Sequence, residues 1–239
     1  VSPGGYVMGS IPGIHENVIV LDFKSLYPSI IRTFHVDPLA LAVAASQENP
    51  IPGYDGGEFS RSEFILPELI STLWTARDKA KAGQNAVLSQ AIKIIMNSFY
   101  GILGTVGCRF LDSRLVSSIT KRGHEILIES KNFIEAEGYQ VIYGDTDSVF
   151  VLLGSVPHDQ VKVIGDDLTA RLNKWWTKRL REKFDIDSNL EMDFETHFSK
   201  FLMPTVRGSD AGSKKRYAGL VVDDTNPDKT HLHSKGTES

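Results

Sequence analysis

Three aspartates at the ends of strand-like segments are the residues best suited to carry out chemistry. Asp22 ends the apolar, β-branched run 18–21, which is typical of a strand buried on both faces. Asp145 and Asp147 lie in a Gly-Asp-Thr-Asp turn, and side chains at positions i and i+2 of a strand point to the same face. If these strand ends meet in one sheet, three carboxylates converge without a basic residue beside them. A divalent cation must then share their charge.

Carboxylate oxygens are hard ligands, which select Mg²⁺, Mn²⁺ or Ca²⁺. Two such ions held about 3.5–4 Å apart would suit phosphoryl or nucleotidyl transfer. The simpler interpretation of the same residues stays open at this point. Aspartate is common in turns because it tolerates the left-handed conformation, and Asp22 could serve as a cap for the helix that follows it.

A second group of polar residues lies on two neighbouring helical segments. Lys93, Asn97 and Tyr100 are spaced i, i+4 and i+7, so a helix places them on one face. Arg77 and Lys81 are four residues apart on the preceding helical segment. Cations and amides that face one way are typical of a triphosphate site, although an ordinary solvated face would have the same spacing.

The elements that must position these residues form an α+β pattern. Helical periodicity covers residues 67–81, 86–103, 117–137 and 166–184, and strand patterns cover 18–21, 140–143, 148–153 and 189–195. A helix through Phe34 begins near Pro28, and residues 47–62 are rich in turn formers and predict a loop. The short connection at Gly83 predicts an antiparallel helical hairpin. We therefore expect a sheet built from strands that are distant in sequence, with helices packed on it and a helical hairpin inserted at about residues 60–107.

The composition is that of a globular protein. Among 239 residues, 41% are apolar and 23% are charged, which argues against a disordered, collagen-like or coiled-coil chain. The single cysteine, Cys108, excludes a disulfide framework and a zinc site built from several cysteines. No apolar run reaches the roughly 18 residues that a transmembrane helix needs, so we expect no membrane partner. An unpaired thiol is compatible with a reducing cytosol. The net charge of −4 argues weakly against binding to nucleic acid by bulk electrostatics.

Four stretches resemble, in order, the motifs of family B DNA polymerases. DFKSLYPSII at 22–31, KIIMNSFYG at 93–101 and YGDTDS at 143–148 are similar to motifs A, B and C, and GSKKRYAG at 212–219 is similar to the Lys-Lys-x-Tyr element before the thumb. The stretches GTVGCRFLDSRLVSSITKRGHEIL and ETHFSKFLMPT further resemble the bacterial DNA polymerase II branch of the family. The resemblance covers about residues 4–222. Each motif falls on the element that periodicity predicts for it.

This resemblance implies a template-directed DNA polymerase that adds deoxynucleotides to a primer 3′-hydroxyl and releases pyrophosphate. It implies an α+β fold in which an antiparallel-sheet palm backed by helices covers residues 1–59 and 108–222. An antiparallel helical hairpin over 60–107 would form the fingers, and residues 223–239 would be a polar tail or the start of a thumb. The implied partners are primer–template DNA, deoxynucleoside triphosphates and a sliding clamp bound through regions outside this chain. A bacterial, nucleoid-associated enzyme of DNA replication or repair is the implied setting.

The resemblance also assigns roles to residues. It implies that Asp22 and Asp147 bind two Mg²⁺ ions, for which Mn²⁺ can substitute, together with the backbone carbonyl of Phe23 and the neighbouring Asp145. The implied nucleotide-binding residues are Ser25, Leu26, Tyr27, Arg77, Lys81, Lys93, Asn97 and Tyr100. Within that set, Lys93 is the general acid for pyrophosphate and Tyr27 is a steric gate against ribose. The implied DNA-binding residues are Gly101, Lys214, Lys215, Arg216 and Tyr217.

Two other kinds of protein remain open from the residues alone. Because 239 residues hold neither an exonuclease domain nor a complete thumb, the chain could bind nucleotide or DNA without turnover. A structural cation-binding domain with acidic turns is the second alternative. Primer extension with Mg²⁺ separates both from a polymerase.

Overall fold

The structure is a computed structural model that describes residues 5–206, 208–223 and 229–236. These residues divide into two compact units. Unit 1 contains Lys24–Glu125 and Trp176–Glu191, and unit 2 contains Gly5–Phe23, Ile126–Trp175 and the described residues from Met192 onward. The helices α5 (Ser113–Ala136) and α6 (His158–Phe184) each contribute residues to both units.

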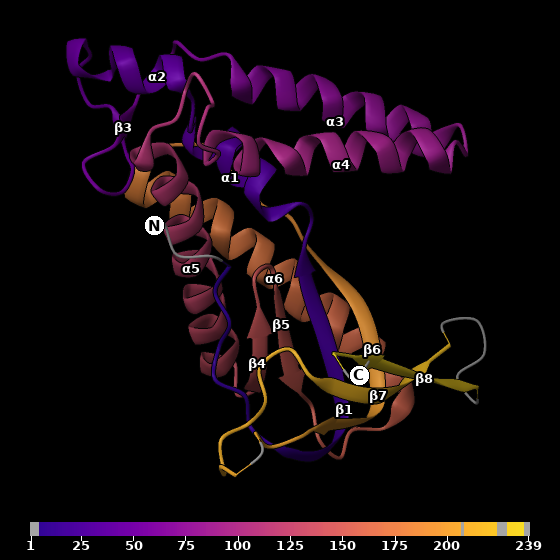
Figure 1. The fold of residues 1–239 in the computed structure, drawn as a ribbon. Helices are drawn as coiled ribbons and strands as arrows, with labels where there is room; N and C mark the ends of the chain where they lie inside the picture. Colours follow the sequence, from indigo (N-terminus) through magenta and orange to yellow (C-terminus); the bar gives the residue numbers. More distant parts are fainter. Residues whose placement is uncertain (1–4, 207, 224–228, 237–239) are drawn as a thin grey trace. The chain divides into compact units, whose positions relative to one another are not determined.

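Unit 2 is built on a six-stranded antiparallel sheet (Figure 1). Its strands are β1 (Gly13–Phe23), β4 (Gln140–Asp145), β5 (Ser148–Leu152), β6 (Met192–Met203), β7 (Tyr217–Val222) and β8 (Thr230–Lys235), in the spatial order β4-β5-β1-β6-β7-β8. An antiparallel sheet combined with separate helices confirms the expected α+β class.

The strand β1 owes its buried character to its central place in the sheet. It pairs with β5 on one side and β6 on the other, and residues 18–21 are buried, as the apolar run predicts. Aromatic rings from four other strands pack into the same core, namely Tyr143, Phe150, Phe198, Phe201 and Tyr217. The N-terminal segment runs along β4, since the Met8 N–H donates to the Gly144 carbonyl at 2.8 Å.

Unit 1 contains the helical hairpin that the sequence predicts (Figure 1). Its elements are α1 (Leu26–Phe34), α2 (Pro38–Val43), the 3₁₀ helix η1 (Ala44–Ser46), β2 (Ile51–Pro52), β3 (Glu58–Phe59), α3 (Leu66–Ala82) and α4 (Ala86–Leu103). The helices α3 and α4 pack against each other on either side of a short turn. Asn85 caps α4, because its side chain accepts a hydrogen bond from the Leu88 N–H at 3.0 Å.

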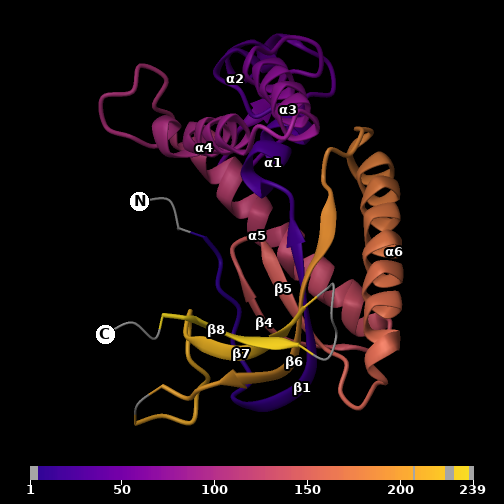
Figure 2. The ribbon, with the colours of Figure 1, turned by 90° about the vertical axis from the view of Figure 1, so that its right-hand side faces the viewer.

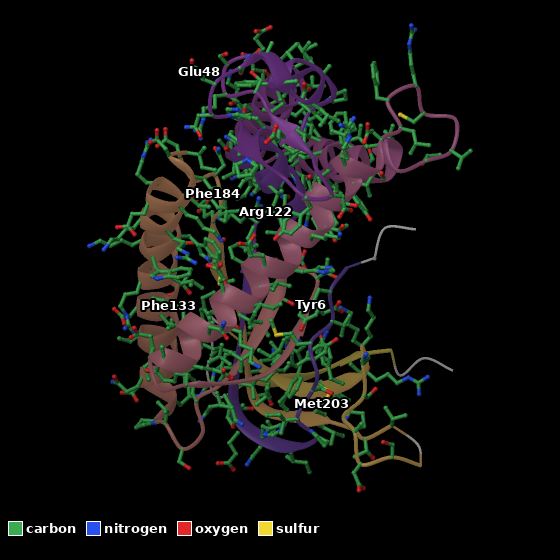
Figure 3. All side chains as sticks on the ribbon, turned by 90° about the vertical axis from the view of Figure 1, so that its left-hand side faces the viewer. Tyr6, Glu48, Arg122, Phe133, Phe184 and Met203 are labelled. Carbon is green, nitrogen blue, oxygen red and sulfur yellow. The ribbon has the colours of Figure 1, made fainter. Side chains whose placement is uncertain are left out.

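A buried arginine organises the core of unit 1. Arg122 on α5 is 5% exposed, and its guanidinium carbon lies 4.4 Å from the ring centroid of Phe34 and 4.8 Å from that of Phe184 (Figure 3). Its charge is compensated by Glu125 at 2.5 Å. The arginine thereby joins three helices, α1, α5 and α6.

The structure corrects several expectations about the elements. The strand expected over residues 189–195 begins at Met192 and continues to Met203. Residues 47–62 contain the short β2–β3 ladder instead of being all loop. The helix α6 begins at His158, well before residue 166, and Gly165 within it lies close to the Phe194 ring. The polar stretch from residue 223 contains β8, which pairs with β7 (Figure 2). All six residues of β8 are exposed, so no hydrophobic alternation marks them as a strand.

By length and composition alone, α4 is apolar enough to cross a membrane, with 18 residues and a mean hydropathy of 1.3. Gln90, Lys93 and Asn97 interrupt its apolar sequence. Because a single helix of this kind is weak evidence, the expected absence of membrane association stays a prediction.

Candidate active site

A cavity of about 610 Å³ lies on the sheet of unit 2, and its lining includes Lys235 and two histidines of β8 as well as three carboxylates. Asp22, Asp147 and Glu195 line it from β1, the β4–β5 turn and β6. Pairing of β1 with its neighbours positions these groups, because Asp22 is opposite Ser148 on β5. The Phe23 N–H also donates to the Asp147 carbonyl at 2.9 Å. The sheet therefore brings Asp22 and Asp147 to one cavity, as the sequence predicts.

The turn between β4 and β5 departs from strand geometry. Thr146 has a left-handed φ of 55°, and the Asp147 N–H donates to the Asp145 carbonyl at 2.6 Å. The i, i+2 rule for strands consequently does not apply to Asp145 and Asp147. Asp145 is 7% exposed and is not among the residues that line the cavity. In residues 5–206, 208–223 and 229–236, no three carboxyl, imidazole or thiol groups lie close enough together to hold an ion. The structure therefore places Asp22 and Asp147, but not Asp145, at the cavity, and metal binding by the three carboxylates stays a prediction.

Two lysines lie beside Asp145, which corrects the expectation that no basic residue would be near. The ammonium groups of Lys215 and Lys235 are each 3.6 Å from one of its carboxylate oxygens. Pairing between β7 and β8 brings Lys235 to this place, since it is opposite Tyr217 in the ladder. The two ammonium groups thus compensate the negative charge of the Asp145 carboxylate.

In contrast to Asp145, Asp147 has a carboxyl group whose negative charge is disfavoured by its surroundings. Burial raises its pKa, the charge of Asp145 raises it further, and Glu195 adds to the same effect, while Lys235 opposes it. A cation bound in the cavity would relieve this repulsion. The carboxylate oxygens of Asp22 and Asp147, which line the cavity, fit a hard divalent ion such as Mg²⁺ by their chemistry.

The cationic group expected on the helical hairpin lies wholly in unit 1. Lys81, Lys93 and Asn97 are exposed, and no carboxylate within the described part of the chain pairs with either lysine. Arg77 is half-buried, and its Nε atom is buried without a hydrogen-bond partner among the described residues. An unsatisfied guanidinium N–H of this kind suits an anionic ligand.

The first turn of α1 has an unusual geometry. Ser25 caps the helix with a left-handed φ of 45° and makes no side-chain capping bond. The N–H groups at the start of a helix lack intrahelical partners, so this turn suits an anion. Two residues further on, the Tyr27 ring lies 4.7 Å from the ring of Tyr100 on α4, measured between centroids, at an angle of 55°.

The residues expected to contact DNA differ in exposure. Lys214, Lys215 and Arg216 are exposed, and Gly101 is exposed on α4. The Lys215 N–H donates to the Tyr143 hydroxyl at 3.1 Å, which anchors this basic segment to β4. Tyr217 is only 7% exposed, because its ring belongs to the aromatic core of unit 2.

Three residues at these sites were not assigned a role from the sequence. Glu195 belongs to an acidic alternation in residues 191–195, which most often marks a solvated strand face. Lys235 carries no sequence signal, because only the β7–β8 pairing brings it to Asp145. Gly123 lies under the Tyr27 ring, and its place in the middle of a helix is the one available signal.

The comparisons with known proteins show the family of the chain. The model of DNA polymerase family B matches residues 2–239. The chain is 52% identical to DNA polymerase II of Escherichia coli strain K12 over 100% of its own length and 30% of that protein. It is 30% identical to the DNA polymerase delta catalytic subunit of Glycine max over 99% of its length and 23% of that protein. It is 29% identical to a DNA polymerase of Thermococcus gorgonarius over 92% of its length and 28% of that protein.

The chain therefore belongs to DNA polymerase family B, as the motifs predict. The similarity to bacterial DNA polymerase II is likewise confirmed. The chain spans less than a third of the length of these relatives.

Proposed function

We propose that this chain is the palm-and-fingers part of a DNA-directed DNA polymerase. The observation that carries the proposal is that Asp22 of motif A and Asp147 of motif C line one cavity in a member of this family. The substrates would be primer–template DNA and deoxynucleoside triphosphates. A bacterial cytoplasmic location, association with the nucleoid and a sliding-clamp partner belong to the same proposal, supported by the identity to a bacterial DNA polymerase II.

In this proposal Asp22 and Asp147 hold two Mg²⁺ ions, together with the Phe23 carbonyl. When bound, such ions lower the pKa of the attacking hydroxyl and stabilise the charge that develops on the phosphates. Asp145 serves as the neighbouring carboxylate, and its pairing with Lys215 and Lys235 holds it in place without a cation. The cavity residues orient the primer 3′-hydroxyl for in-line attack on the α-phosphate.

The hairpin and the start of α1 would hold the triphosphate. Arg77, Lys81 and Lys93 supply charge, and Asn97 supplies an amide, to the β- and γ-phosphates. The backbone N–H groups of Ser25, Leu26 and Tyr27 donate to the same phosphates. Lys93 would also give a proton to the departing pyrophosphate as a general acid.

The proposal also assigns residues to the selection of the sugar and to the binding of the primer. Tyr27 would occupy the volume that a ribose 2′-hydroxyl needs, so that only a deoxyribose fits, and Tyr100 would pack beside the nascent base pair. Lys214, Lys215 and Arg216 would contact the primer backbone, with Gly101 and Tyr217 close to the duplex. Contacts to phosphates and to the minor groove do not depend on base identity, which suits an enzyme that must copy any sequence.

Primer extension with Mg²⁺ tests this function. We expect extension by the protein and a loss of at least about 100-fold in Asp147→Asn, because that variant loses a ligand charge in the cavity. The matched control is Asp210→Asn, an exposed aspartate outside the cavity, which should extend normally. Nucleotide binding without extension would instead support a non-catalytic module. A change in thermal stability without any change in nucleotide affinity in Asp147→Asn would support a structural cation domain.

A further inference from the structure

A glycine on α5 lies directly against the ring of Tyr27. A Cβ atom built on Gly123 would lie 3.3 Å from Cε1 of Tyr27, 3.6 Å from Cδ1 of Ile30 and 3.7 Å from Cδ2 of Leu26. The last two separations are ordinary van der Waals contacts. Only the contact with Tyr27 is tighter than normal, so a methyl group at this position would act on that ring in particular.

The backbone does not require glycine at this position. Gly123 lies inside α5 and is not among the glycines with positive φ. Glycine in a helix interior costs about 0.5–1 kcal/mol relative to alanine. Space for the neighbouring ring, rather than backbone freedom, is the property that glycine provides.

The Tyr27 ring is confined by a second element as well. Tyr100 on α4 contacts it with a centroid separation of 4.7 Å. Its own helix, α1, begins at Leu26 after the left-handed cap Ser25, and its residues Leu26 and Ile30 are buried in the core. A ring pushed by Gly123→Ala therefore moves away from α5 while its backbone stays fixed.

We propose that Gly123 is a positioning residue for sugar selection: its missing side chain sets where the Tyr27 ring lies, and thereby how closely the ring approaches the sugar of the incoming nucleotide. This inference rests on the steric-gate role proposed for Tyr27. A displaced ring no longer fits against the sugar of the deoxynucleotide. Displacement should therefore weaken binding of the deoxynucleotide more than it slows the chemical step.

A double-mutant cycle tests the inference, with single-nucleotide incorporation measured for a deoxynucleotide and the matching ribonucleotide. We expect Gly123→Ala to raise KM for the deoxynucleotide about tenfold, with kcat changed less than about threefold. In a Tyr27→Ala background the same substitution should change KM less than about twofold, because the ring through which it acts is gone. Gly104→Ala is the matched control, since its Cβ would lie 3.5 Å from Val116 in ordinary contact, and it should behave as the parent protein.

A second readout does not depend on activity. In protein with ¹³C-labelled tyrosine rings, Gly123→Ala should shift the ring signals of Tyr27 and leave those of Tyr143 unchanged. Its Tm should not fall by more than about 2 °C, because alanine favours the helix.

The outcomes separate this inference from the function on which it rests. Equal KM effects of Gly123→Ala in both backgrounds, or an unmoved Tyr27 signal, would overturn the role of Gly123. If Tyr27→Ala keeps full discrimination against ribonucleotides, the gate role fails instead. If the parent protein extends no primer, the polymerase proposal fails, and the ring signals still decide whether Gly123 positions Tyr27.

Discussion

Glu125 on α5 receives hydrogen bonds from Arg122 on its own helix and from two side chains that are distant in the sequence. Tyr54 donates to it at 2.9 Å, Lys183 at 2.6 Å and Arg122 at 2.5 Å. Burial raises the pKa of this carboxyl, but the hydrogen bond from Lys183, the charge of Arg122 and the hydrogen bond from Tyr54 together lower it below its ordinary value of 4.5. One carboxylate thus connects the β2–β3 segment, α5 and α6 within unit 1.

The lowered pKa of Glu125 predicts a pH dependence of stability. Because the folded state binds the proton less tightly than the unfolded chain, the carboxylate stabilises the fold above pH 4.5, and this contribution is lost as the pH falls from 4.5 through the lowered pKa. We expect Glu125→Gln to lower the free energy of unfolding by about 1–3 kcal/mol at pH 7. The variant should also lose less stability than the parent on acidification below pH 4.5.

Urea unfolding between about pH 3 and pH 7 measures both effects. Glu135→Gln is the control, since Glu135 is exposed on the same helix and its ion pair with Lys131 is long, at 3.9 Å. Parallel pH profiles for the parent and Glu125→Gln would contradict this account.

At the scale of elements, a single aspartate fixes the start of two helices. Asp37 is 1% exposed, and its Oδ1 accepts from the Ala40 N–H in the first turn of α2 at 2.8 Å. Its Oδ2 accepts from the N–H groups of Leu66 at 2.7 Å and Ile65 at 3.2 Å, at the start of α3. The first arm of the helical hairpin is thereby tied to α2.

We expect Asp37→Ala to lower the free energy of unfolding by about 2–4 kcal/mol, because two helix caps are lost and buried N–H groups are left unpaired. Amide hydrogen exchange should accelerate most at Leu66 and Ala40. Asp37→Asn should cost about half as much, because its amide keeps one accepting oxygen. Thermal or urea unfolding together with hydrogen exchange checks this, and equal costs for the alanine and asparagine variants would contradict the double-cap interpretation.

At the scale of the whole molecule, the parts that sequence could predict are those set by local patterns. The buried run before Asp22, the Gly-Asp-Thr-Asp turn and the helical hairpin follow from periodicity and turn chemistry. Exposed β8 has no such pattern, and Lys235 reaches Asp145 only because β8 pairs with β7. The close packing of Gly123 on Tyr27 likewise joins α5 to α1 over a long sequence separation. Tertiary pairing determines these features, so a local pattern cannot predict them.

The net charge of −4 is a sum over regions of opposite sign. The cavity in unit 2 carries acidic side chains, whereas Lys214, Lys215 and Arg216 form an exposed basic segment before β7. A negative total charge is therefore compatible with the proposed binding of DNA through this segment, since phosphate contacts are local and release counterions. Lys215 shares its charge with Asp145, so Lys214 and Arg216 should carry most of the sequence-independent binding.

Replacing Lys214 and Arg216 together by alanine should weaken binding to primer–template DNA and reduce the slope of log K against log salt by about 0.9 per lost phosphate contact, or about 2 in total. The matched control replaces Lys162 and Lys178, two exposed lysines of α6 that pair with acids on their own helix. Fluorescence anisotropy at several salt concentrations measures both variants. An equal change of slope in the two variants would mean that bulk charge, and not the basic segment, binds the DNA. If Lys214 and Arg216 contact the DNA backbone, only the variant that lacks them should show a changed slope. Its loss of affinity should then be the same for unrelated DNA sequences.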